Sequence, residues 1–266
     1  MYHITCDTHT HTFYSRHAFS TIEENVRAAH DEGMELLGST DHYGSMLWPG
    51  EPDIRNYQYF LCVGMWPRRW HGVYLLRGCE ADIIDLKGHL FGSDVKVKKN
   101  IVNDRLDKPT RLDKEVFRDL DYVIASIHYS DFTKGASIKE TTRMYLGALE
   151  NPKVLVLGHI GRAGVPFDVD TVVKAARDAN KLIEVNEHSF GVKPVSKEAC
   201  KKIIVRCAEL GCSISLGTDA HIATDIGRFD KTLALLSEVD FPEELIASRN
   251  KDSFLAAVEK AGTARA

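Results

Sequence analysis

The sequence contains no Cys-x-x-Cys pair, which excludes a zinc ribbon and a thioredoxin-type redox motif. Its six cysteines are spread along the chain, at positions 6, 62, 79, 200, 207 and 212. Several of them stand in apolar runs, where a free cysteine behaves as a small hydrophobic residue. We therefore expect most of them to be reduced, buried thiols.

An excess of charge of either sign is also missing. The 34 Lys and Arg residues oppose 38 Asp and Glu residues, giving a formal net charge of −4, so nothing draws the chain to long nucleic acid or anionic lipid. The longest apolar runs, such as residues 154–160, fall far short of the roughly 20 residues that cross a bilayer. Residues 1–6 lack the basic and apolar regions of a secretory signal. We expect a cytoplasmic protein without membrane contact.

Apolar, strand-like runs alternate with helical segments along the chain. Seven such runs occupy residues 2–6, 35–39, 75–79, 122–126, 154–157, 182–185 and 213–216. A capping-box pattern at 20–23 opens the first helix. The alternation predicts an α/β fold with a parallel sheet, either a closed barrel or a doubly wound open sheet. A charged stretch at 81–110 predicts a hairpin insertion, and the lack of a low-complexity linker predicts one domain over residues 1–266.

The placement of histidines is the strongest functional signal in the sequence. Eight of the twelve histidines follow predicted strands: His9, His11, His17, His42, His128, His159, His188 and His221. Glu80 and Asp219 stand at the same kind of position. Because the carboxyl ends of parallel strands meet on one face, where the following loops build active sites, we expect these side chains to gather there.

These residue types indicate a metal centre. In the His-x-His segment formed by His9 and His11, both imidazoles project to one side of an extended chain, so one ion can take both. Imidazole and carboxylate together suit zinc, iron or manganese, and the lack of cysteine at these positions argues against a purely structural zinc site. The candidates outnumber the ligands that one ion needs. Three sites that share a bridging carboxylate would use them, and clustered metals suit the hydrolysis of phosphate esters.

Four motifs carry a resemblance to a known family. They are Asp-Thr-His-Thr-His at 7–11, Thr-Asp-His at 40–42, Gly-His at 158–159 and Thr-Asp-Ala-His at 218–221. Together with Glu80 and His128, they make the chain resemble the polymerase and histidinol phosphatase (PHP) family over nearly its whole length. Within that family it is most similar to the short bacterial metal-dependent phosphatases of the YcdX type.

The resemblance implies a fold and a metal centre. The expected fold is a distorted seven-stranded (β/α)7 TIM-like barrel that holds three divalent ions, with zinc expected and manganese or iron as alternatives. By this resemblance the first ion is held by His9, His11, Glu80 and Asp219, the second by Glu80, His128 and His159, and the third by His17, His42 and His221. Glu80 then bridges two ions, and a hydroxide between metals is the nucleophile.

Further residues are candidates for catalysis and for substrate contact. Glu80, Asp219 and His128 would act within the metal centre, and Asp41 would orient an imidazole or protonate the leaving group. Arginine grips phosphate through parallel hydrogen bonds. The candidates for contact with phosphate or substrate are therefore the loop residues Arg16, Arg162 and Arg228, together with His188.

The function that these features favour is metal-dependent hydrolysis of a small phosphate monoester, with a small phosphorylated metabolite as the partner. The enzymatic alternatives are a phosphodiesterase acting on nucleotide ends and an amidohydrolase-type metal-dependent hydrolase. A non-enzymatic metal-binding regulatory protein is the remaining alternative. The sequence leaves the organic part of the substrate and the oligomeric state open.

Overall fold

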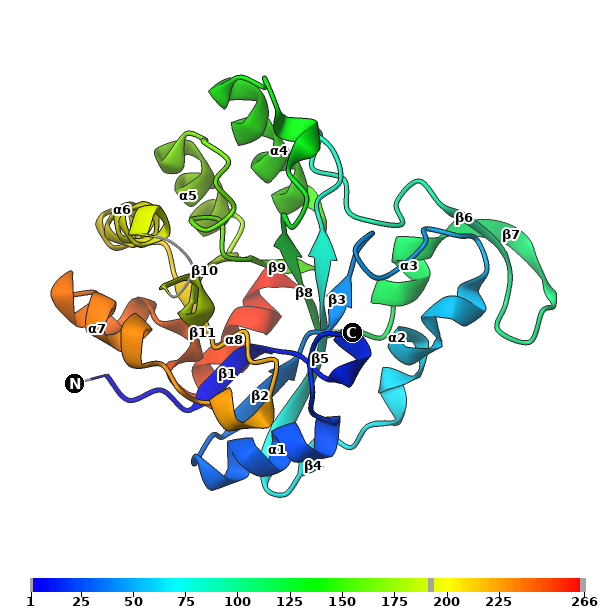
Figure 1. Cartoon of the computed structure of the whole chain (residues 1–266), viewed down its shortest axis with the longest axis horizontal. Helices are drawn as coiled ribbons and strands as arrows, with labels where there is room; N and C mark the ends of the chain where they lie inside the picture. The colour runs from blue at the N-terminus through cyan, green and yellow to red at the C-terminus, as the bar shows by residue number, and fades with distance from the viewer. Residues whose placement is uncertain (1, 191–193, 264–266) are drawn as a thin grey trace.

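The computed structural model describes residues 2–190 and 194–263, and its central feature is a barrel of parallel strands (Figure 1). Seven strands follow one another in the order β1-β2-β5-β8-β9-β10-β11. They span Cys6–Thr10 (β1), Leu36–Ser39 (β2), Val73–Asp82 (β5), Tyr122–Ser126 (β8), Val154–Leu157 (β9), Leu182–Asn186 (β10) and Ile214–Gly217 (β11). Every pairing along this order is parallel, which confirms the sheet predicted from the alternating pattern.

The first and last strands approach each other and nearly close the barrel. The backbone N–H of His11 donates to the carbonyl of Ala220 over 2.9 Å, and the N–H of Asp219 donates to the carbonyl of His9 over 2.8 Å. Thr10 and Ala220 also form an isolated parallel bridge. These bonds decide between the two architectures that the pattern leaves open, because an open sheet would leave its edge strands apart. The chain forms a distorted (β/α)7 barrel.

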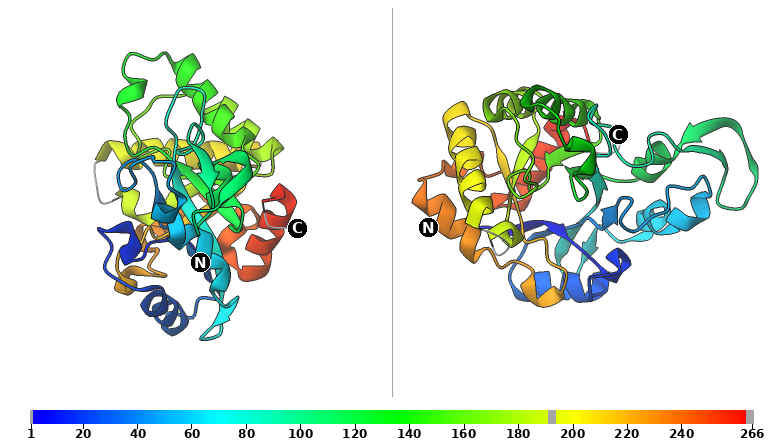
Figure 2. Two further views of the ribbon diagram at one scale, coloured as in Figure 1. Left: turned by 90° about the vertical axis from the view of Figure 1, so that its right-hand side faces the viewer. Right: turned by 45° about the horizontal axis from the view of Figure 1, so that its top comes forward.

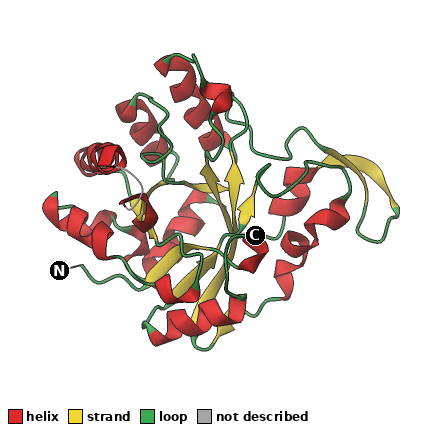
Figure 3. Ribbon diagram, in the orientation of Figure 1, coloured by secondary structure: helices red, strands yellow, loops and turns green. Residues whose placement is uncertain are grey.

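Helices follow the strands and pack around the barrel (Figures 1 and 3). They span Ile22–Asp31 (α1), Gln58–Cys62 (α2), Leu112–Phe117 (α3), Ile138–Glu150 (α4), Val169–Asp178 (α5), Pro194–Leu210 (α6), Asp230–Glu238 (α7) and Lys251–Ala261 (α8). Thr21 and Ser137 open α1 and α4 with capping boxes, which satisfy backbone N–H groups that a helix start leaves free. The first box pairs Thr21 with Glu24, one residue later than predicted. No helix in the described ranges is long and apolar enough to cross a membrane.

The helix α8 covers the amino end of the barrel. Phe254 of this helix lies in a buried apolar cluster with Leu36, Tyr122 and Leu182, which are the first residues of their strands. The Phe254 and Tyr122 rings meet edge to face, with centroids 5.6 Å apart. Figure 2 shows this helix in red against the strands. Apolar packing therefore fills one end of the barrel, and polar side chains gather at the other.

A β-hairpin projects from the barrel between β5 and β8 (Figures 1 and 2). Its antiparallel strands span Lys96–Lys99 (β6) and Arg105–Arg111 (β7). The hairpin confirms the insertion predicted within residues 81–110, although β7 ends one residue beyond that range. Two short strands, His42–Tyr43 (β3) and Arg69–Trp70 (β4), also pair with β5.

The main difference from the sequence prediction concerns the first strand. The apolar run covers residues 2–6, but β1 spans Cys6–Thr10, is polar after its first residue, and is buried throughout. Polar residues can form this buried strand because their side chains hydrogen-bond inside the protein. Thr8, for example, donates its hydroxyl to the carbonyl of Leu216 over 2.7 Å. The strand β5 likewise runs on to Asp82, so Glu80 lies within a strand and not after it.

Candidate metal centre

Nine side chains meet at the carboxyl ends of the barrel strands. They are His9, His11, His17, His42, Glu80, His128, His159, Asp219 and His221, and the structure brings all nine predicted ligands into one connected cluster. The short strand β3 and the long strand β5 supply His42 and Glu80, and the segments after β8, β9 and β11 supply four others. Most members are buried, whereas His17 is exposed at the opening of the cluster.

Glu80 lies in the middle of the cluster. Its Oε1 atom is 2.6 Å from His159 Nε2 and 3.4 Å from His128 Nε2. Its Oε2 atom is 2.7 Å from His42 Nδ1 and 3.4 Å from His9 Nε2. Burial raises the pKa of this carboxyl, but the surrounding histidines outweigh burial and hold the pKa well below its usual range. Glu80 is therefore an ionised carboxylate that faces five imidazoles, because His11 Nε2 also lies 3.7 Å from Oε2.

Hydrogen bonds at the outer ring atoms fix the tautomers of His9 and His11. His9 Nδ1 lies 2.6 Å from a carboxylate oxygen of Glu184, so this nitrogen carries a proton. His11 Nδ1 lies 3.1 Å from Ser15 Oγ, and Ser15 donates its own hydroxyl to Asp41, so His11 Nδ1 is also a donor. In the neutral rings both Nε2 atoms then present lone pairs, and these two atoms are 3.1 Å apart.

A carboxylate oxygen of Asp219 lies close to both of these nitrogens. Asp219 Oδ1 lies 3.1 Å from His11 Nε2 and 3.7 Å from His9 Nε2. Acceptor atoms that converge without a proton between them repel one another, and a cation among them removes that repulsion. Burial lowers the pKa of His9, but the neighbouring carboxylates, Glu184 first, outweigh burial and raise it well above its usual value. The group therefore attracts positive charge, which a proton or a metal ion can supply.

The outer part of the cluster repeats this arrangement. His221 Nδ1 donates to the backbone carbonyl of Asp219 over 2.8 Å, so in the neutral ring His221 Nε2 is a lone-pair atom, 2.9 Å from His17 Nε2. The ring of His42 lies beside that of His17, with centroids 5.0 Å apart. Burial lowers the pKa values of both His17 and His221. Both rings are therefore neutral at about pH 7, the form that binds metal.

His128 and His159 approach Glu80 from loops that follow β8 and β9. His128 Nδ1 lies 2.5 Å from Asp82 Oδ1, which leaves Nε2 to face Glu80. Burial lowers the pKa of His128, but Glu80 and Asp82 outweigh burial and raise it to about 10. His159 has a left-handed backbone conformation, with φ of 30°, and its N–H donates to Glu184 over 2.7 Å. Asp82 thus holds the ring of His128, and Glu184 holds the backbone of His159.

Among the residues that the structure describes, three buried atoms of the cluster have no hydrogen-bond partner. They are His42 Nδ1, Glu80 Oε2 and His159 Nδ1. Buried polar atoms without partners are uncommon and costly, and the first two lie 2.7 Å apart without the geometry of a hydrogen bond. A cation beside them would satisfy both. Imidazole nitrogen and carboxylate oxygen are ligands that suit zinc, iron and manganese, so the residues present fit a metal centre.

Within residues 2–190 and 194–263, three overlapping groups of side chains have ligand atoms close enough to hold one ion each. They are His9, His11 and Asp219; His42, Glu80 and His128; and His11, His42 and His221. The first contains three of the four residues expected around the first ion. His42 lies beside Glu80 as well as beside His221, although the resemblance assigns it to one ion only. His17 and His159 are outside these groups, and the division of the nine ligands among ions stays a prediction.

Asp41 lies behind the cluster. It accepts hydrogen bonds from the N–H and the hydroxyl of Thr12, from the Ser15 hydroxyl over 2.6 Å, and from the Tyr59 hydroxyl. Ser15 in turn contacts His11. This position fits the orienting role predicted for Asp41, which acts on His11 through Ser15. Asp41 is not among the residues that line the cavity beside the cluster.

Glu184 of β10 is a residue of the site that the sequence interpretation missed. One of its oxygens accepts from His9 Nδ1 and the other accepts from the backbone N–H of His159. Its signal in the sequence is a single acid between the apolar residues Ile183 and Val185 of a strand. Such an acid needs polar partners in the interior, but the sequence does not tell which partners these are.

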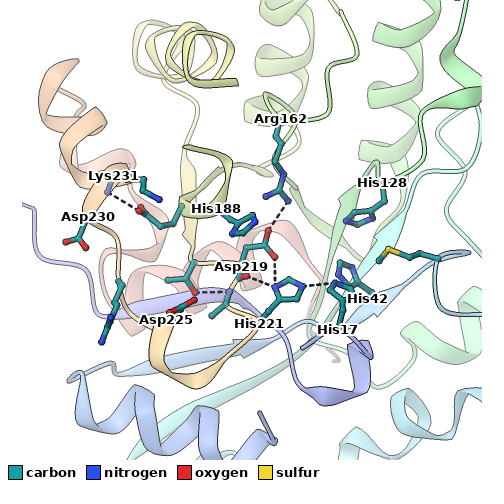
Figure 4. Close-up of a pocket in the computed structure, with 15 residues that line it drawn as sticks. His17, His42, His128, Arg162, His188, Asp219, His221, Asp225, Asp230 and Lys231 are labelled. Carbon is teal, nitrogen blue, oxygen red and sulfur yellow. Dashed lines mark hydrogen bonds and ion pairs between the residues drawn. The ribbon is translucent and has the colours of Figure 1, made fainter. Parts of the chain in front are cut away.

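A cavity of about 750 Å³ opens beside the cluster (Figure 4). The cluster members that line it are His17, His42, His128, Asp219 and His221. Three predicted substrate contacts, Arg162, Arg228 and His188, line it as well. Arg16 does not line it, and its guanidinium lies 5.8 Å from the centre of the Trp48 ring instead.

Arg162 connects the cavity to the metal cluster. Its Nη2 atom lies 2.9 Å from Asp219 Oδ2, and its Nη1 atom lies 3.4 Å from Asn186 Oδ1. Figure 4 shows the guanidinium pointing toward Asp219, with His188 nearby. Asp219 thus offers one oxygen to Arg162 and the other to the two histidines of the first group.

Comparison with known sequences identifies a family. The model of the PHP domain family matches residues 7–193. A probable phosphatase of Clostridium botulinum is 40% identical over 256 residues, which cover 96% of this chain and 95% of the relative. A probable phosphatase of Caldanaerobacter subterraneus is 37% identical over 250 residues, which cover 94% of this chain and 89% of the relative.

Comparison with solved structures finds chains of similar fold. A histidinol phosphate phosphatase from Lactococcus lactis, solved with zinc, L-histidinol and phosphate, aligns with a TM-score of 0.56 over 90% of this chain and 94% of its own, at 19% identity. An archaeal ribonuclease P solved with mature tRNA includes a chain that aligns with a TM-score of 0.54 over 96% of this chain and 90% of its own, at 10% identity. At these identities the likeness concerns the fold alone.

Proposed function

Because the chain belongs to the PHP domain family, we propose that it is a metal-dependent phosphatase and that its substrate is a small phosphate monoester. The relatives from Clostridium botulinum and Caldanaerobacter subterraneus, which match nearly the whole chain, are both named probable phosphatases. The Lactococcus lactis enzyme of similar fold is named for the hydrolysis of a small monoester. These names and the metal-ligand cluster support a phosphoric ester hydrolase.

One observation carries the proposal, namely the convergence of lone-pair atoms at the carboxyl end of the barrel. His9 Nε2, His11 Nε2 and Asp219 Oδ1 face one another, and in the neutral rings none of these atoms carries a proton, so a metal ion fits among them. We assign three divalent ions to the cluster, with zinc expected and manganese or iron as alternatives. Bound ions of this kind activate water near neutral pH and neutralise charge on phosphoryl oxygens.

The protein's own residues would hold the substrate. Arg162 has guanidinium N–H groups beyond those used by Asp219 and Asn186, and we assign these to a phosphate oxygen. His188 and Arg228 line the same cavity, and we assign them to the organic part of the substrate or to its phosphate. A cavity of about 750 Å³ has the size of a site for a small metabolite.

Metal analysis combined with two ester assays tests the proposal. Purified protein should contain about three ions per chain and should hydrolyse p-nitrophenyl phosphate at a rate that a chelator abolishes and added metal restores. Bis(p-nitrophenyl) phosphate is the matched diester. Faster hydrolysis of the diester would overturn the monoester assignment, and metal-loaded protein that turns over neither ester would overturn the phosphatase proposal.

A further inference from the structure

The strand β10 supplies none of the nine predicted ligands, yet two of its side chains contact the centre. Glu184 and Asn186 are both buried, and residues two apart on a strand project from the same face. Glu184 contacts His9 and His159, and Asn186 contacts Arg162. Neither residue lines the cavity, so both contact the cluster from the protein interior.

Glu184 links two parts of the metal cluster. Its Oε1 atom accepts from His9 Nδ1 over 2.6 Å, and its Oε2 atom accepts from the backbone N–H of His159 over 2.7 Å. The other ring nitrogen of His9 faces Asp219, whereas the Nε2 atom of His159 contacts Glu80 over 2.6 Å. One carboxylate therefore touches residues assigned to the first ion and to the second.

The barrel leaves room for this contact at Gly217 of β11. A Cβ atom at Gly217 would lie 2.4 Å from the Cβ of His9 and 2.8 Å from Oε1 of Glu184. Both distances are shorter than the separations at which Cβ atoms contact other atoms in proteins, so any larger residue would push His9 and Glu184 out of place. The close approach of β1, β10 and β11 thus depends on a glycine beside this hydrogen bond.

We propose that Glu184 is a positioning residue that sets the affinity of two metal positions together, by fixing the tautomer of His9 and the place of His159. The proposal rests on the metal-dependent function given above. A carboxylate accepts from both donors at once, holds the His9 proton on Nδ1 and leaves Nε2 free for a metal ion. Glu184→Gln replaces one acceptor oxygen with an NH2 group of similar size. The NH2 group cannot accept from the donor that it faces, and the remaining oxygen, now neutral, accepts more weakly from the other donor, so both contacts are weakened.

The metal content of the full-length protein tests the proposal. For Glu184→Gln we expect bound metal to fall from about three ions per chain to about one after gel filtration, because the position assigned to His17, His42 and His221 does not involve Glu184. Competition with a chelator should show that the two weakened positions bind zinc roughly 10- to 100-fold less tightly. Excess zinc should restore kcat toward the wild-type value, a response that a merely misfolded variant would not give.

Asp121→Asn is the matched control. Asp121 is another buried carboxylate, and it accepts two hydrogen bonds from Arg68 and one from the backbone N–H of Arg77. It directly precedes β8 and therefore lies at the end of the barrel opposite the metal centre. This variant should lose stability but keep its metal.

The outcomes separate the two proposals. Wild-type metal content and affinity in Glu184→Gln would overturn the positioning role. Wild-type protein with three tightly bound ions and no esterase activity would overturn only the proposed function. Wild-type protein that binds no metal would overturn both.

Discussion

Glu80 and His42 are direct neighbours in parallel strands, and their side chains bring Glu80 Oε2 within 2.7 Å of His42 Nδ1 without a hydrogen bond between them. The backbone register of β3 on β5 sets this distance. Because the strands themselves fix both side chains, little ordering remains to be done when an ion binds. The barrel thus holds the ligands in place, and loops supply the residues at the opening, such as His17 and His221.

Replacement of Glu80 should disable more than one metal position. Glu80→Gln removes the negative charge that five imidazoles face and one of the two oxygens that contact them. We expect the loss of about two ions per chain and a fall in kcat of roughly 100-fold or more, measured by metal analysis and by hydrolysis of p-nitrophenyl phosphate. Glu259→Gln, at an exposed position of α8, is the control. Full metal content and turnover in Glu80→Gln would rule out a bridging role.

The sequence was sufficient to predict strands whose buried residues are apolar. Residues 122–126 and 154–157 match β8 and β9 residue for residue. The prediction was wrong for β1, because most of its buried residues are polar and hydrophobicity does not mark them. The extent of one domain over residues 1–266 and the cytoplasmic location stay predictions.

The candidate ligands could be found from sequence because strand ends share one face of a barrel, and the structure brings all nine together. Their grouping could not be found, since it depends on which ring atoms converge. His42 illustrates this, because its contact with Glu80 comes from the register of a two-residue strand. Glu184 could not be found either, because its partners come from β1 and from the loop after β9, far away in the sequence.

Loss of the Arg162 side chain should weaken substrate binding. Arg162→Ala removes the guanidinium that we assign to phosphate and leaves Asp219 Oδ2 without its partner. A hydrogen bond between charged groups is worth about 1.5–3 kcal/mol, so kcat/KM should fall roughly 10- to 100-fold, with most of the change in KM. Arg16→Ala is the informative comparison, because Arg16 does not line the cavity. Equal losses in the two variants would argue against a specific role for Arg162.

Enlargement of Gly217 should displace His9 and Glu184 together. Gly217→Ala places a methyl group 2.4 Å from the Cβ of His9, and such overpacking typically costs about 1–3 kcal/mol of stability. We expect a lower free energy of urea unfolding and weaker zinc binding in the same variant. Gly64→Ala is the matched control, because a Cβ there meets no atom within 4 Å. Tight zinc binding in Gly217→Ala would mean that the barrel adjusts without moving His9.

Lys181, which lies away from the metal centre, should make a pH-dependent contribution to stability. Its ammonium group is buried at the start of β10 and donates to the carbonyls of Leu149 and Asn151 at the end of α4. Burial lowers the pKa of Lys181 to about 8, whereas a lysine in an unfolded chain has a pKa of about 10.4. Between these values the unfolded chain binds a proton that the folded chain has released. The free energy of unfolding contributed by Lys181 should therefore rise with pH in that window, by at most about 1.4 kcal/mol per pH unit.

Lys181→Met removes this proton linkage and leaves the two carbonyls without their donor. The variant should have a lower free energy of unfolding than the wild type. This gap in free energy should widen between about pH 8 and pH 10, because the neutral amine becomes the dominant form in the folded wild type. The neutral amine has two N–H groups and can still donate to both carbonyls. Urea unfolding of both proteins across this range measures the gap, and other groups that titrate there cancel because both proteins contain them. Lys174→Met, at an exposed position of α5, should show a small gap that does not change with pH. A constant gap for Lys181→Met would mean that Lys181 keeps its charge in the folded protein throughout the range.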